Sequence, residues 1–117
     1  MAIEPLLKPK PRVLERDAKR KAKETQRRET YRVVEQRDQM TCRCCQKRVR
    51  KTMELRMDLL EHHHVNGRDV ADAEGSWNVC LLCRGCHVER HVTRTLHISG
   101  NADGLLTFER GDERWTG

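Results

Sequence analysis

The stretch that decides the fold reads NVCLLCRGCHVERH and covers residues 78–91. It opens with an apolar run from Val79 to Leu82, and after Cys83 the chain continues without proline to residue 95. Short apolar runs are typical of buried strands, whereas the later apolar positions share one face of a helix. The stretch therefore predicts a short buried strand that passes directly into a helix over residues 84–95.

Four cysteines form two C-x-x-C pairs, one inside this stretch and one well before it. The pairs are Cys42 with Cys45 and Cys83 with Cys86. At this spacing each pair of thiolates chelates one Zn²⁺ from a tight turn, and two pairs complete a tetrahedral site. Since four protein ligands leave no open position for water or substrate, we expect one structural Zn²⁺ that takes the place of a larger core.

The two remaining cysteines receive no metal role. Cys80 also has C-x-x-C spacing to Cys83, but it lies in the middle of the apolar strand, so we expect a core residue there and a spare thiol at Cys44. Two other interpretations of the thiols stay open, namely small buried hydrophobic residues or a redox C-x-x-C. No thioredoxin-like βαβ pattern surrounds the pairs, which disfavours the redox interpretation.

The composition predicts a small core and an anionic partner. The 117 residues are 36% hydrophobic and only 3% aromatic, and such a chain needs a disulfide, a metal or a partner chain to fold. The net charge of +6 favours a polyanion. The apolar runs are far shorter than the roughly 20 residues that span a bilayer. Because the first residues lack a secretory h-region, we expect a cytoplasmic location, where cysteines ligate metals rather than form disulfides.

Imidazoles gather around the same strand and helix. His87 and His91 are four residues apart on the predicted helix and so share one face. Upstream, Glu61-His62-His63-His64-Val65 ends a segment, residues 53–65, that is typical of a strand approaching a site. A hairpin followed by a helix brings imidazoles from both around one metal ion. His62 alone keeps the interpretation of an ordinary polar residue.

Outside these motifs, turn residues separate the other elements. Residues 66–77 have the composition of a surface loop. Residues 96–98 and 105–108 flank a turn rich in glycine and asparagine, which predicts a hairpin before a polar tail.

The N-terminal part is a basic arm. Three prolines within residues 5–11 precede a segment without proline or glycine, residues 12–39, which predicts a helix. Up to Met40 the chain carries twelve basic and seven acidic residues, so nearly all of the excess charge lies here. The apolar positions of this helix form only a thin stripe: Leu14, Ala18, Ala22, Val33 and Val34. The sequence leaves open whether the helix contacts DNA or a partner chain.

The motifs together resemble those of the HNH endonuclease family, which has a ββα-metal fold. The matching residues are Cys42-x-x-Cys45, Glu61-x-His63-His64-Val65, Asn78-Val79-x-x-Leu82-Cys83-x-x-Cys86-His87 and His91. The resemblance implies an α+β chain in which a ββα-metal finger is stabilised by the Cys₄ zinc site, with a basic N-terminal helix and a C-terminal hairpin. The implied division is an arm and helix at 1–40, a nuclease domain at 41–110 and a tail at 111–117.

The resemblance also implies a role for each site residue. His64 is similar to the general base of the family, and Asn78 to the asparagine that braces the loop aiming it. The metal ligands would be His63, His87 and His91. Apart from the resemblance, the chemistry of phosphodiester cleavage leads us to expect that Glu61 orients a histidine as part of the catalytic group and that Arg84 and Arg94 grip phosphate beside the histidine face of the helix.

The expected ligands also bear on the catalytic metal. Many HNH members carry an aspartate where this chain has His63, so the expected site has three nitrogen ligands. Mg²⁺ prefers oxygen ligands, whereas imidazole suits transition metals. We therefore expect Mn²⁺, with Ni²⁺ or Co²⁺ also able to support activity and Mg²⁺ weaker.

These expectations describe a divalent-metal-dependent HNH endonuclease acting on double-stranded DNA. One metal and one base per chain predict nicking of one strand by a monomer or weak homodimer, and the resemblance implies 5′-phosphate and 3′-hydroxyl ends. The main alternative is a zinc-stabilised nucleic-acid-binding module without catalysis. A zinc-dependent protein-interaction adaptor is a third interpretation.

Overall fold

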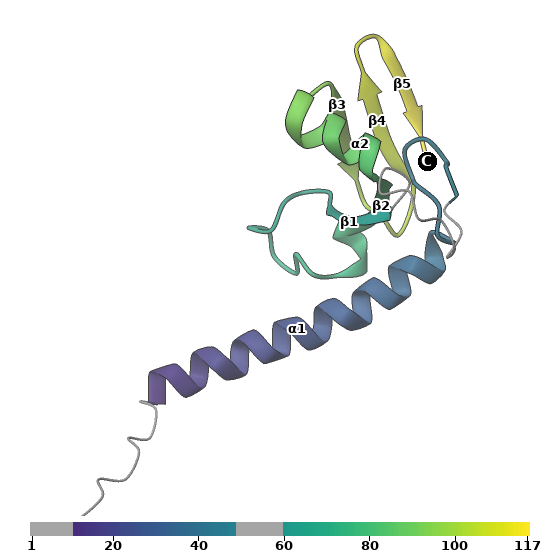
Figure 1. Ribbon diagram of the computed structural model, residues 1–117. Helices are drawn as coiled ribbons and strands as arrows, with labels where there is room; N and C mark the ends of the chain where they lie inside the picture. The colour runs from purple at the N-terminus through teal and green to yellow at the C-terminus, as the bar shows by residue number, and fades with distance from the viewer. Residues whose placement is uncertain (1–10, 49–59) are drawn as a thin grey trace, which may run out of the picture.

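The protein is a small α+β chain, seen in a computed structural model that describes residues 11–48 and 60–117 (Figure 1). Helix α1 (Pro11–Arg37) precedes a two-stranded sheet and a three-stranded sheet, both antiparallel. The remaining elements are, in chain order, β1 (Leu60–His64), η2 (Ser76–Asn78), β2 (Val79–Cys83), α2 (Arg84–Val88), η3 (Glu89–Thr93), β3 (Leu96–Gly100), β4 (Leu106–Arg110) and β5 (Glu113–Thr116).

The deciding stretch forms the predicted strand and passes directly into a helical segment, but this segment is part α-helix and part π-helix and is shorter than the predicted 84–95. Strand β2 is buried along its whole length and pairs with β1 so that His63 lies opposite Cys80. Cys83 then caps α2, which continues into the single π-helical turn η3. The helical segment ends after Thr93 because Arg94 adopts a left-handed conformation with φ of 57°. The sheet and the helical segment together form a β-β-α unit.

Both faces of β2 are covered, which explains its unbroken burial. Side chains alternate along a strand, so Val79 and Leu81 face one way and pack with Val34 of α1. Cys80 and Leu82 face the other way and join a core that includes Phe108 of the second sheet. The expected core role of Cys80 agrees with its complete burial.

Within the part of the chain that the structure describes, helix α1 packs on the sheets through its C-terminal half. Arg37 donates hydrogen bonds to the carbonyl oxygens of Ser76 (2.7 Å) and Val79 (2.6 Å). The ring of Tyr31 stacks on His62, with centroids 3.8 Å apart and planes within 5°. Of the expected apolar stripe, Val34 is buried, whereas Leu14, Ala18, Ala22 and Val33 are exposed. The N-terminal half of α1 therefore projects away from the sheets (Figure 1).

The second sheet is larger than the hairpin that the sequence predicts. Strands β3 and β4 form that hairpin, and β5 adds a third strand within residues 111–117, where a polar tail is expected. Trp115 of β5 stacks against Phe108, with ring centroids 5.7 Å apart, and its Nε1 donates to the carbonyl of Cys44 at 3.0 Å. This strand thus ties the second sheet to the first cysteine pair.

Two of the segments predicted from the sequence lie partly outside the described residues. The strand expected within residues 53–65 is present as β1, and residues 53–59 lie outside the described part of the chain, as does most of the proline-rich segment at 5–11. Among the described residues, the helices lack the apolar length that a bilayer crossing requires.

Candidate functional site

The first candidate site is a cluster of four cysteines. Its members are Cys42 and Cys45, in the turn after α1, and Cys83 and Cys86, at the junction of β2 and α2. The four sulfur atoms all lie within 4.8 Å of one another, and the Sγ atoms of Cys45 and Cys83 are 3.7 Å apart. Sulfurs bound tetrahedrally at about 2.3 Å from zinc are separated by about 3.8 Å. The cluster can therefore hold a structural Zn²⁺.

The local backbone also suits thiolate ligands. In each pair the amide of the second cysteine points at the sulfur of the first, from Cys45 to Cys42 and from Cys86 to Cys83, at 3.5 Å in both cases. Burial raises the pKa of the Cys45 thiol to about 11, which disfavours the thiolate on its own. A bound divalent cation reverses that preference, because it stabilises the thiolate electrostatically. Cys44 is buried beside the cluster but outside the group of four.

The second candidate site is a cluster of three histidines on the β-β-α unit. His63 comes from β1, His87 from α2 and His91 from η3, and each offers a ring nitrogen within 4.8 Å of the others. Ring centroids are 4.6–5.2 Å apart, and Nε2 of His91 lies 3.3 Å from Nδ1 of His63. Nitrogens that share one metal at about 2.1 Å lie at such a separation. The cluster can hold a divalent metal.

The charge state of His63 favours ligation. Burial and the neighbouring His87 and His91 lower the pKa of His63 to about 3, so its ring is neutral at pH 7. Its Nε2 is buried and has no hydrogen-bond partner among the described residues. Oε2 of Glu61 lies 2.9 Å from Nδ1 of His87, which leaves Nε2 of that ring as the ligand atom. Glu61 therefore orients a histidine of the cluster.

His64 occupies a different environment from its neighbour. Consecutive side chains alternate on a strand, so His64 lies on the face of β1 opposite to His63 and is not part of the three-histidine cluster. Its Nε2 is 3.1 Å from Oε2 of Glu74, in the loop between the two strands. Arg27 of α1 pairs with the same carboxylate through Nε (3.2 Å) and Nη2 (3.4 Å). These contacts thus connect β1 to α1 through His64, Glu74 and Arg27.

The carboxylate of Glu74 is ionised. Burial opposes ionisation, but the hydrogen bonds with His64 and Arg27 outweigh it and lower the pKa of Glu74. An ionised carboxylate at Nε2 selects the tautomer of His64 that carries its proton there and leaves Nδ1 as the basic nitrogen. The sequence does not predict the roles of Glu74 and Arg27, because no spacing rule links a loop glutamate to a histidine ten residues earlier.

Asn78 braces the loop between β1 and β2. It is completely buried, and its Oδ1 accepts hydrogen bonds from the backbone amide (2.8 Å) and the side chain (3.1 Å) of Asn66. Its Nδ2 donates to the carbonyl oxygens of Gly67 and Ala73, both at 2.9 Å. One side chain therefore joins both ends of the loop that carries Glu74 to His64.

The two arginines expected to contact phosphate lie at either end of the helical segment. Arg84 begins α2 and Arg94 directly follows η3, and both are exposed. Within residues 11–48 and 60–117, neither forms an ion pair, so both guanidinium groups are available to a ligand.

A scan of protein-family models, a search of curated proteins and a search of solved structures each found no match to this chain.

Proposed function

We propose that this chain is a divalent-metal-dependent endonuclease of the HNH type that nicks double-stranded DNA. The observation that carries the proposal is the convergence of His63, His87 and His91 on one point of a β-β-α unit. Three protein ligands leave coordination positions open, in contrast to the four-cysteine cluster, and open positions distinguish catalytic from structural metal sites. The positive charge of the chain favours a polyanionic substrate.

The three imidazoles would hold the catalytic metal, with Glu61 fixing the ring of His87. A divalent metal bound there would neutralise charge on the scissile phosphate and stabilise the leaving oxygen. Nitrogen ligands favour Mn²⁺, Ni²⁺ or Co²⁺ over Mg²⁺. The four cysteines would hold a separate structural Zn²⁺.

His64 would act as the general base. The contact with Glu74 fixes its Nε2–H, so Nδ1 can accept the proton of an attacking water. Asn78 would hold the loop that positions Glu74, and the exposed Arg84 and Arg94 would bind phosphate oxygens. The products would carry 5′-phosphate and 3′-hydroxyl ends.

The test is the conversion of supercoiled plasmid to open circles by the purified chain. Separate reactions contain Mn²⁺, Ni²⁺, Co²⁺, Mg²⁺ or no added metal, and we expect open circles with the first three at higher rates than with Mg²⁺. His87→Ala should abolish the product, whereas His97→Ala, which changes an exposed histidine of β3, should not. Plasmid that is bound but never cut, with any of the metals, would instead favour the non-catalytic nucleic-acid-binding module.

A further inference from the structure

The part of α1 that projects from the sheets carries a row of basic side chains on one face. The row consists of Arg16, Lys19, Arg20, Lys23 and Arg27, and we call it the α1 basic face. These positions are three or four residues apart, which places them on one side of a helix. From first to last the row covers eleven helical steps, or about 16 Å.

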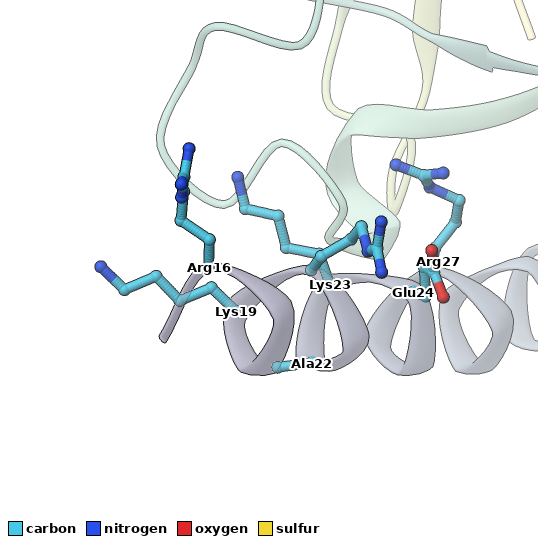
Figure 2. A pocket seen from close by; sticks show the side chains of 7 residues that line it. Arg16, Lys19, Ala22, Lys23, Glu24 and Arg27 are labelled. Atoms are coloured by element: carbon cyan, nitrogen blue, oxygen red, sulfur yellow. The ribbon is translucent and has the colours of Figure 1, made fainter. Parts of the chain in front are cut away.

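The charges on this face are available to a ligand. Arg16, Lys19, Arg20 and Lys23 are exposed, and only Arg20 forms an ion pair within the described residues, with Asp17 one turn earlier. The face lines a groove, and among the described residues that line it Glu24 is the acidic one. Figure 2 shows the ends of Arg16, Lys23 and Arg27 on the same side of the helix, toward the loop that follows β1.

This groove leads toward the candidate catalytic residues. A second groove, between α1 and the loop, shares Lys23 and Arg27 with the first and is also lined by Arg68 and Glu74. Glu74 in turn contacts His64 at 3.1 Å. The α1 basic face is therefore continuous with the contacts of Arg27 with Glu74 and of Glu74 with His64, the proposed general base.

The side chains of the α1 basic face indicate which class of ligand it binds. A helix that packs on a second protein chain needs an apolar stripe. Among the side chains that the structure describes in the projecting half of α1, the apolar ones are Leu14, Ala18 and Ala22, all exposed. Arg16, Lys19 and Lys23, which form no ion pair within the described residues, instead suit a ligand with regularly spaced negative charges. One strand of duplex DNA presents a phosphate about every 3.4 Å along the helix axis, so about 16 Å of α1 spans several phosphates.

We propose that the α1 basic face binds the phosphate backbone of double-stranded DNA and directs the duplex toward the His64 end of the site. The choice of DNA as the polyanion rests on the proposed nuclease function. The contacts are to phosphates, so they add affinity and orientation without sequence preference.

The experiment compares two triple variants of the full chain with equal change in charge. Arg16→Gln/Lys19→Gln/Lys23→Gln removes charge from the α1 basic face. Lys21→Gln/Arg28→Gln/Arg32→Gln removes the same charge from exposed positions on the other side of α1. Glutamine keeps a high helix propensity, and circular dichroism checks that both variants retain the helix. Fluorescence anisotropy measures binding to labelled 30-base-pair duplexes of several sequences, over a series of salt concentrations and without added divalent metal.

For the first variant we expect affinity to fall at least about tenfold at low salt, equally for every sequence. The slope of log K against log salt should flatten by about 2 to 3, since each lost phosphate contact is worth about 0.9. The second variant should stay within about twofold of the parent. Equal losses in both variants, or no loss in the first, would overturn the proposal.

Plasmid nicking separates this proposal from the nuclease proposal. If the α1 basic face guides the substrate, the first variant should need more enzyme to reach half-maximal nicking but keep the maximal rate. A parent chain that binds DNA through this face and never cuts would support DNA binding by the α1 basic face and contradict the nuclease proposal. If the parent chain nicks plasmid and the first variant nicks it with the same dependence on enzyme concentration, the result would support the nuclease proposal and contradict DNA binding by the α1 basic face.

Discussion

At the scale of single residues, the contact of His64 with Glu74 bears most directly on the proposed chemistry. The histidine is nearly buried, and it lies on the face of β1 away from the three-histidine cluster. A buried hydrogen bond of this kind can also serve stability alone. A substitution that separates rate from fold and metal binding distinguishes these roles.

We expect His64→Ala to lower the nicking rate by about 10² to 10⁴, the usual contribution of a general base. Metal affinity should stay unchanged, because His64 is outside the group of three ligands. Plasmid assays give the rate, and calorimetric titration with Mn²⁺ gives the affinity. His97→Ala is the matched control, since His97 is exposed on β3. Loss of the folded state together with the rate would make the His64–Glu74 contact structural.

A second prediction concerns the cysteine cluster. Cys83→Ser should lower the zinc content from one equivalent per chain toward none and greatly destabilise the fold, because the core is too small to replace a metal crosslink. Cys80→Ala is the control, since Cys80 is buried but is not one of the four grouped cysteines. Elemental analysis and thermal unfolding measure the two effects. A zinc-free Cys83→Ser with the parental melting temperature would contradict a structural zinc.

At the scale of elements, β5 connects parts of the chain that are distant in sequence. Its Trp115 contacts Phe108 of β4 and the carbonyl of Cys44, and Gly117 exchanges two backbone hydrogen bonds with Leu106. The side chain of Arg43 also donates to the Gly117 carbonyl at 2.9 Å. The strand therefore supports the turn that carries the first cysteine pair.

Trp115→Ala should destabilise the protein by roughly 2 to 4 kcal/mol, since it removes a large aromatic contact and leaves the Cys44 carbonyl without its donor. Urea unfolding of the zinc-loaded chain measures the change. Leu105→Ala, which truncates an exposed side chain of the same sheet region, should change stability by less than about 0.5 kcal/mol. Similar effects of the two substitutions would mean that β5 contributes little to stability.

The elements differ in how well the sequence predicts them. The strand-to-helix stretch, the cysteine pairs and His87 with His91 were predictable, because metal ligands and helical faces follow fixed local spacings. Strand β5 was missed since Trp115 is a lone aromatic among charged residues. The Glu74 contact was missed as well, because it depends on how a twelve-residue loop folds back, which no local pattern specifies.

At the scale of the whole molecule, the described residues contain one group of three histidines per chain. In-line attack on a phosphate has one direction of approach, so each encounter should cut one strand. During a time course on supercoiled plasmid, open circles should accumulate first and linear DNA should lag behind. Linear product that appears at once, with a second-order dependence on enzyme concentration, would contradict a monomeric nickase and indicate a two-fold dimer.

The positions of the four cysteines in the sequence also determine when, during translation, the cluster can form. Cys45 and Cys83 are 38 positions apart, and β1 with His63 lies between them. A ribosome adds about 5 to 20 residues per second, so the first cysteine pair waits about 2 to 8 seconds for Cys86 to be synthesised. Until then the nascent chain holds half of the four-cysteine cluster, and His63 of β1 lacks its partners His87 on α2 and His91 on η3. The four-cysteine cluster can therefore be completed only after β1, β2 and the first residues of α2 have been translated.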